Sequence, residues 1–462
     1  MKKRIFALFL IVLMLFSLLS CSSSIQISKT SETAHQKESE EKTETEEMKE
    51  TGDIILPQGF SVGYAKKAVN PDEGVGLAGF SNVGSRLSKV ILDDIMITCT
   101  ALSDGEKVFL ILCFDTAAID EVITNSVTKR LGKMFSGLEI PAENIFLNAT
   151  HTHSAPAVHR EDAPGIGLYM KKFYPALYEV AERALRDLSL STIEYSTTNT
   201  EGLNYVRRYV TLDGTKYLGG SALDTGLDPE EVRHETQPDT QLQLLRFKRE
   251  EGKDVVLCNW QCHPCSFRIG TESGTSVSSE WCGVMRKEVE KNLGVNFAYL
   301  QGAAGNLVST TKIRGEKDNP DYTKKGKELA EVVEKALENT TRLGSGAFQA
   351  LRKEMTYNLE KGKNHDKTLY LSALTIGEVA FATVPCELHD TLGVQVKEES
   401  PFKVTFMCGY TNGHHGYVPA SFAFENGGYE VESTYYERGT GEKIVEDLLT
   451  LLREINSLCT KG

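Results

Sequence analysis

Two histidines, one residue apart, follow an apolar run in the first third of the sequence. Residues 145–156 read Ile-Phe-Leu-Asn-Ala-Thr-His-Thr-His-Ser-Ala-Pro, so His151 and His153 come directly after a segment typical of a buried β-strand. In an extended chain, residues i and i+2 point the same way, and both imidazoles are expected to face one space. Imidazole is a common metal ligand, so the pair indicates a metal site, although chance core or surface histidines also occur at this spacing.

Three further apolar runs end in polar residues of the same kind. They lead to His263, to Glu387 and to Tyr417. Ligand sites in α/β proteins gather at the carboxyl ends of strands, so we expect the four strand ends to converge on one cleft.

Each of these residues also allows a second interpretation. Glu387 could be a first-turn helix residue favoured by the helix dipole, and Tyr417 could be an ordinary core aromatic. His263 stands between two cysteines, and Cys262, His263 and Cys265 could form a metal cluster of their own.

The same stretches carry a resemblance to a known family. Residues 148–156 are similar to the T-H-T-H-S-G-P signature of the neutral/alkaline non-lysosomal ceramidases, which are zinc-dependent amidases. Further blocks resemble that family in order from residue 54 to the C-terminus: Asp239 to Phe247 (D-P-x-x-x-x-L-R-F), 259–264 (N-W-x-x-H-P), 384–387 (V-P-G-E), and Gly416-Tyr417-Val418 followed by Tyr429-Glu430.

The resemblance implies a zinc ion held by His151, His263, Glu387 and Tyr417. Two imidazoles, a carboxylate and a phenolate suit Zn²⁺, and an open coordination position leaves room for a water. Such a water would be activated near neutral pH, and the metal could also polarise an amide carbonyl.

Three further residues are implied to act on the substrate. His153, beside the metal, is the candidate to shuttle a proton or steady the developing oxyanion. Tyr429 resembles the second active-site tyrosine of the family, and Arg207 matches its arginine, with Arg208 almost equally eligible.

One block departs from the family pattern. Residues 301–310 resemble Q-x-x-x-G-N-L-S-P-N, but Val308 stands where the active-site serine would be. Ser309 is one place away, and a one-residue slip turns a side chain to the opposite face of an extended chain. The departure leaves the substrate open between ceramide and another N-acyl amide.

Strand and helix patterns alternate without a fixed repeat. This predicts an α/β fold, a layered domain of mixed β-sheets flanked by helices. Strands are expected at 91–101, 108–114, 193–196, 242–247, 255–260, 297–300, 369–376, 379–384 and 404–408. Helices are expected at 119–135, 168–188, 284–293, 324–337 and 444–458, with a kink at Pro175.

The composition of the chain limits the classes of molecule that it is expected to bind. The formal net charge is -13, with 64 acidic and 51 basic residues, and no basic segment is interleaved with aromatics. Nucleic acid is therefore excluded as a partner, and a small or lipidic molecule is favoured. Nine cysteines follow residue 21, placed mostly in apolar strands, which predicts buried thiols rather than a disulfide framework.

The N-terminal residues are typical of a targeting segment. Residues 1–20 have a basic start and an apolar stretch too short to span a bilayer, and Leu18-Leu19-Ser20-Cys21 resembles a bacterial lipobox. An ordinary signal peptide is the alternative. Residues 21–53 are polar, charged and expected to be a disordered tether. This predicts an extracytoplasmic protein anchored to a bacterial membrane through lipidated Cys21, with a ceramidase-like catalytic domain at 54–462.

The sequence thus predicts a zinc-dependent amidase of the neutral ceramidase type. Two alternatives have different consequences. A (β/α)₈ amidohydrolase also uses a His-x-His motif, but an early hairpin does not fit an alternating barrel. A solute-binding lipoprotein without catalysis would close on its ligand and need no metal.

Overall fold

The computed structural model describes residues 53–80, 83–214, 229–267, 272–310, 321–346, 348–359 and 367–460. The compact unit runs from Asp53 to Gly462. The predicted signal peptide, Cys21 and nearly all of the predicted tether lie outside the described residues. No helix within the described ranges is both long enough and apolar enough to span a membrane.

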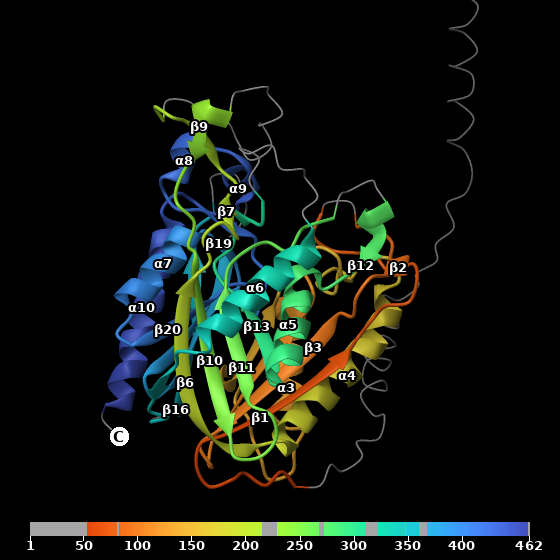
Figure 1. Cartoon of the computed structure of the whole chain (residues 1–462), viewed down its shortest axis with the longest axis vertical. Helices are drawn as coiled ribbons and strands as arrows, with labels where there is room; N and C mark the ends of the chain where they lie inside the picture. The colour runs from red at the N-terminus through yellow and green to blue at the C-terminus, as the bar shows by residue number, and fades with distance from the viewer. Residues whose placement is uncertain are drawn as a thin grey trace, which may run out of the picture. The chain divides into compact units, whose positions relative to one another are not determined.

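A mixed nine-stranded sheet forms the centre of the unit (Figure 1). In spatial order its strands are β13 (Asn296–Gln301), β11 (Val255–Trp260), β10 (Gln241–Arg249), β6 (Ser189–Asn199), β1 (Ser61–Ala68), β3 (Met96–Ser103), β4 (Val108–Phe114) and β5 (Ile145–Ala149), and β15 (Thr341–Leu343) pairs with β6. Parallel pairing occurs between β11 and β13 and between β4 and β5. Strands β1 and β6 share only two residue pairs, so this short contact joins two halves of the sheet.

A four-stranded sheet lies against the larger one. It consists of β16 (Phe348–Tyr357), β17 (Lys367–Ile376), β18 (Val379–Thr383) and β20 (Val404–Cys408), with β18 and β20 parallel. Two-residue and three-residue strands form four small pairs: β2 (Val90–Ile91) with β12 (Ser276–Val277), β7 (Tyr205–Val206) with β14 (Leu307–Val308), β8 (Tyr209–Thr211) with β9 (Val232–His234), and β19 (Glu387–Leu388) with β21 (Tyr417–Val418).

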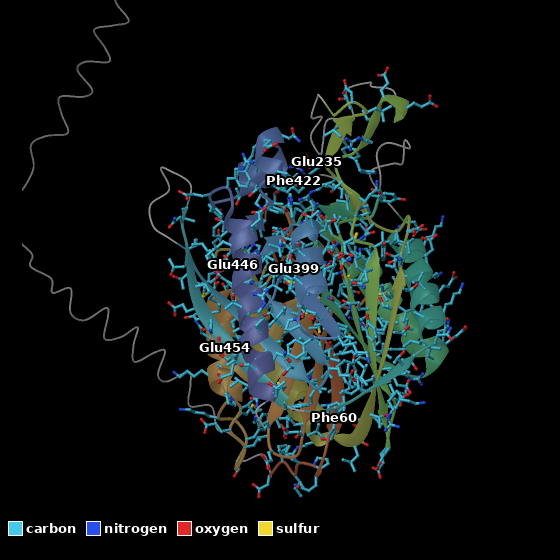
Figure 2. The ribbon with its side chains drawn as sticks, turned by 90° about the vertical axis from the view of Figure 1, so that its left-hand side faces the viewer. Phe60, Glu235, Glu399, Phe422, Glu446 and Glu454 are labelled. Atoms are coloured by element: carbon cyan, nitrogen blue, oxygen red, sulfur yellow. The ribbon has the colours of Figure 1, made fainter. Side chains whose placement is uncertain are left out.

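Helices cover the outer faces of both sheets. They are α3 (Glu121–Leu131), α4 (Ile166–Arg186), α5 (Glu280–Leu293), α6 (Tyr322–Ala336), α7 (Asp390–Glu399), α8 (Ala423–Asn426), α9 (Tyr429–Ser433) and α10 (Thr440–Cys459), with short 3₁₀ turns at Ala142–Asn144, Pro229–Glu231 and Glu272–Thr275. In Figure 2, α7 and α10 lie in front of the smaller sheet, and Glu446 and Glu454 lie on α10. The exposed glutamates alternate with buried leucines at helical spacing, which seats α10 on the sheet.

Separate apolar cores fill the spaces between the layers. The two sheets share one core, which includes Phe109, Phe247 and Phe381. Helices α3 and α4 pack on one half of the large sheet, α5 and α6 on the other half, and α7 and α10 on the small sheet. The predicted layered α/β class with mixed sheets is confirmed, and two stacked sheets rule out a barrel.

Most predicted elements are present with shifted ends. The predicted strand at 91–101 is wrong at its start: Val90–Ile91 is a separate short strand, and the hairpin strand begins at Met96. Pro175 does lie inside a helix, α4. Helix α7 and strand β16 were not predicted. All nine cysteines in the described ranges are free thiols, and only Cys265 and Cys459 are not fully buried.

Polar side chains join the sheets where the parallel strands end. Asn148 on β5 donates from Nδ2 to the carbonyl of Gly409 and to Oγ1 of Thr411, at 2.8 Å each. Its Oδ1 accepts the backbone N–H of Gln301, the last residue of β13, at 3.0 Å. Asn259 on β11 donates to the carbonyls of Leu300 and Met407. The strand ends of both sheets are therefore held together.

Replacing Asn148 with Ala should lower the free energy of unfolding by about 3 kcal/mol, because three buried partners lose their hydrogen bonds. Chemical denaturation measures this loss. The control is Asn125→Ala on the exposed face of α3, which should change stability by less than about 0.5 kcal/mol. Equal effects from both substitutions would contradict the proposed join.

Candidate metal centre

Two histidines and a glutamate from three separate strand ends meet in the interior. Nε2 of His151 and Nε2 of His263 each lie 3.3 Å from Oε2 of Glu387. All three residues are buried. Strand order explains the meeting, because His151 follows β5, His263 follows β11, and Glu387 follows β18.

Backbone carbonyls set the tautomer of both imidazoles. Nδ1–H of His151 donates to the carbonyl of Ala117 at 2.6 Å. Nδ1–H of His263 donates to the carbonyls of Ala304 and Leu307, at 2.8 and 3.0 Å. A carbonyl only accepts, so each Nδ1 carries a proton, and each Nε2 is the ring nitrogen that faces Glu387. This is the usual arrangement behind metal-ligating histidines.

The donor atoms fit a divalent cation. Nε2 of His263 and Oε2 of Glu387 are buried and have no hydrogen-bond partner of acceptable geometry. Burial lowers the pKa of His263 to about 4, so its imidazole is neutral at pH 7. Burial would raise the pKa of Glu387, but the nearby His151 and His263 outweigh burial and hold it well below its usual value. A neutral imidazole at His263 and an ionised carboxylate at Glu387 are the protonation states that metal binding requires.

His153 reaches the same space by a different route from the predicted one. Its Nε2 lies 3.2 Å from Nε2 of His151, and ligand atoms of His151, His153 and His263 all lie within 4.8 Å of one another. The assumption of an extended chain is wrong, because β5 ends at Ala149 and His151 has a φ of 67°. The left-handed conformation of His151 itself, not strand alternation, brings the two imidazoles together.

Tyr417 lies beside the glutamate through its own short strand. It pairs with Glu387 in the two-residue β19–β21 ladder and is buried. Burial and the charge of Glu387 raise the pKa of Tyr417 well above its usual value, while neighbouring Arg207 opposes that shift. Tyr417 is thus the strand partner of Glu387, and it lies next to a permanent cation, Arg207.

Arg207 and Tyr429 form the outer part of the site. The guanidinium carbon of Arg207 lies 5.4 Å from the ring centre of Tyr417 and 5.2 Å from that of Tyr429. Arg207 donates to Oε1 of Glu430 and to the carbonyl of Gly305, at 2.7 Å each. Tyr429 is 53% exposed, so it stands at the rim.

The structure separates Arg207 from Arg208. Arg208 is fully buried and pairs with Glu235 and Glu430. It also donates to the carbonyl of Ala423, and Figure 2 labels Glu235 and Phe422 near one another at this end of the molecule. Arg208 therefore holds the surrounding segments together, and Arg207 is the arginine that faces the site.

Lysine substitutions should distinguish the two arginines. Arg207→Lys loses the planar stacking on two tyrosines, so the catalytic efficiency should fall at least about tenfold while stability changes little. Arg208→Lys breaks a buried charge network and should lower the free energy of unfolding by about 3 kcal/mol. Steady-state kinetics and denaturation of both variants measure these effects. A reversed pattern would contradict the assignment.

Glu280 connects the two histidine-bearing loops. Its Oε2 accepts the backbone N–H of Ser266 at 2.6 Å, and its Oε1 accepts from Oγ of Ser154 at 3.2 Å. The residue is buried and has a φ of 54°. Burial raises the pKa of Glu280 to about 7, against which its hydrogen bonds act. The sequence contained no signal for this residue beyond its acidic type.

Glu280 should make stability depend on pH. The folded-state pKa lies above the unfolded value of about 4.3, so its contribution is fully present below that value and is lost as pH rises through about 7. Glu280→Gln should remove this part of the pH dependence between pH 5 and 8. Unfolding free energies measured across that range check it, and an unchanged slope would contradict the prediction.

The structure also bears on the second interpretations of His263 and Glu387 and on the departure from the family pattern at Val308. Within the described residues, the group of metal-ligating side chains that contains His263 pairs it with His151 and His153 and not with Cys262 or Cys265. Glu387 does not begin a helix, since it lies in β19, ahead of α7. Val308, at the position where the motif resemblance leads one to expect a serine, forms a backbone bridge with His263.

The fold is layered, and histidine, carboxylate and tyrosine side chains lie where its joined strands end. Comparisons with known proteins identify solved structures that share this fold. No family model and no curated protein matches the chain. Among solved structures, one described as a ceramidase complexed with C2 is 15% identical, with a TM-score of 0.69 over 87% of this chain and 76% of the other.

A neutral ceramidase from Pseudomonas aeruginosa is similar to the same degree. It is also 15% identical, with a TM-score of 0.67 over 86% of this chain and 74% of the other. The chain therefore has a neutral-ceramidase-like fold, and the resemblance seen in its motifs is confirmed at that level.

Proposed function

We propose that the protein is a zinc-dependent hydrolase of linear amides that cleaves ceramide or a related N-acyl amide lipid. The observation that carries the proposal is a pair of imidazoles whose Nδ1–H groups donate to backbone carbonyls and whose Nε2 atoms each lie 3.3 Å from one buried carboxylate. The ceramidase-like fold supports the substrate class. An acidic protein without a basic patch agrees with an uncharged or lipidic substrate and no nucleic acid.

His151, His263, Glu387 and Tyr417 would hold the metal. When bound there, Zn²⁺ supplies Lewis-acid polarisation of a carbonyl and lowers the pKa of a water. The chain's own groups then divide the remaining work. Burial lowers the pKa of His153 well below its usual value, so this neutral imidazole can accept a proton.

The rim residues suit charge stabilisation. Burial opposes the charge on Arg207, but Tyr417 and Glu430 raise its pKa well above the usual value, and it remains a cation. Beside it, the hydroxyl of Tyr429 is placed to donate to an oxygen that develops negative charge. Exposure of Tyr429 leaves this side open to an entering substrate.

We also propose that the protein acts outside the cytoplasm, tethered to a bacterial membrane through lipidated Cys21. The lipobox-like Leu-Leu-Ser-Cys and the polar segment after it support this location. An anchored hydrolase would meet lipid substrates at the bilayer surface. Mass spectrometry of the mature N-terminus would test it, and an unmodified or uncleaved terminus would overturn it.

A panel of N-acyl amides, fluorescent ceramide included, tests the reaction on the zinc-loaded protein. Hydrolysis of at least one member that stops on chelation and returns with zinc is the expected result. Ligand-dependent closure with no turnover and no metal requirement would instead favour a solute-binding lipoprotein.

His151→Ala should abolish hydrolysis and weaken zinc binding by more than the roughly 10- to 100-fold typical of residues behind the ligands. Metal analysis after dialysis and the amide assay measure both effects. His234→Ala is the control, because that imidazole contacts the carbonyl of Val206 rather than the cluster. Full activity in His151→Ala would refute the metal assignment.

A further inference from the structure

His153 is held differently from the other two imidazoles of the cluster. Nδ1 of His151 and Nδ1 of His263 each donate to a carbonyl, whereas Nδ1 of His153 is buried without a partner in the described part of the chain. A ring without a hydrogen bond at Nδ1 can tilt or flip unless its neighbours prevent it. Its orientation must therefore come from packing.

Gly79 packs directly on that ring. A Cβ built on Gly79 would lie 2.2 Å from Cγ, 2.4 Å from Cβ and 2.6 Å from Cα of His153. The φ of Gly79 is 97°, which side-chain-bearing residues rarely adopt. Ala78 also bonds through its N–H to the carbonyl of Ala155, so the backbone of this segment is fixed against the histidine loop.

Phe80 and Arg86 complete the contact. The ring of Phe80 meets the imidazole of His153 edge-on, with centres 4.9 Å apart and an angle of 88°. The guanidinium of Arg86 lies over Phe80 at 4.6 Å. Arg86 also donates to three carbonyls: those of His153 at 2.9 Å, Ala78 at 2.6 Å and Gly274 at 3.0 Å.

Arg86 is only 2% exposed, and its hydrogen bonds within the described part of the chain go to backbone carbonyls and not to a carboxylate. Its nearest compensating charge is Glu280, which accepts from Ser154, the residue after His153. Burying the charge of Arg86 costs free energy, and its three hydrogen bonds to backbone carbonyls offset only part of that cost. Such a cost is explained if Arg86 is needed to keep His153 in place.

We infer that Gly79, Phe80 and Arg86 form a clamp that positions the imidazole of His153 independently of the residues that hold the metal. The clamp grips the backbone of His153 through Arg86 and its ring through Gly79 and Phe80. Proton transfer depends steeply on such placement, since an error of about 1 Å can cost about 100-fold in rate.

Three substitutions test the clamp. Gly79→Ala forces the ring aside, and Arg86→Lys replaces a planar fork by a single nitrogen. Both should lower kcat for the N-acyl amide about 10- to 100-fold, with KM within about threefold and the zinc content unchanged. Phe80→Leu keeps an apolar contact and should lower kcat by less, about threefold to tenfold.

Arg249→Lys is the matched control. The side chain of Arg249 is also buried, but at the far end of β10 from the site. It donates to the carbonyls of Lys253 and Asp187 and also pairs with the carboxylate of Asp187 at 3.0 Å. The Arg249→Lys variant should have a lower free energy of unfolding but an unchanged kcat. Unchanged kcat in both Arg86→Lys and Phe80→Leu, or zinc lost in proportion to kcat, would overturn the clamp.

The measurement of kcat rests on the proposed function, so a second measurement is made without substrate. In a proton–carbon spectrum of the zinc-loaded, histidine-labelled protein, the His153 ring signal, assigned by its loss in His153→Asn, should be single and sharp. It should broaden or split in Arg86→Lys and Gly79→Ala but not in Arg249→Lys. Identical signals in all of these proteins would refute the clamp, whereas lack of turnover on every amide would refute only the proposed function.

Discussion

The structure depends on one polar join between two β-sheets. Asn148 bonds to the loop after β20 and to the end of β13, so strand ends from both sheets and from both halves of the larger sheet meet at one residue. Apolar packing alone would leave the sheets free to slide, because it is not directional. Directional bonds between buried groups fix their register, and each missing bond would leave a costly unpaired group.

The cluster of ionisable groups follows from that join. Each donor stands a few residues beyond a strand whose end is already fixed, which places two imidazoles and a carboxylate within 3.3 Å contacts in the interior. Such a set is unfavourable by itself, since burial opposes the charge on Glu387. A cation between the donors would satisfy atoms that otherwise have no partner. Beside this centre, Arg207 and the exposed Tyr429 form a rim whose charge is balanced by Glu430.

The sequence was sufficient for most of the elements and for the convergence of strand ends, although α7 and β16 were not predicted. Apolar runs ending in His263 and Glu387 identified both strands and donors, because strand periodicity and metal-ligand chemistry are local properties. It was insufficient for the left-handed turn at His151, which depends on the loop around it. Arg207 and Arg208 were indistinguishable for the same reason, since only tertiary packing decides which one faces the tyrosines. The sequence did not indicate roles for Gly79, Phe80, Arg86 and Glu280. These roles come from contacts with residues more than sixty positions away.

Anomalous diffraction at the zinc edge, measured on crystals of the zinc-loaded protein, tests the metal site most directly. We expect one strong peak at about 2.0–2.2 Å from Nε2 of His151, Nε2 of His263 and a carboxylate oxygen of Glu387. A peak at the thiols of Cys262 and Cys265, or no peak at the three residues after full loading, would contradict it.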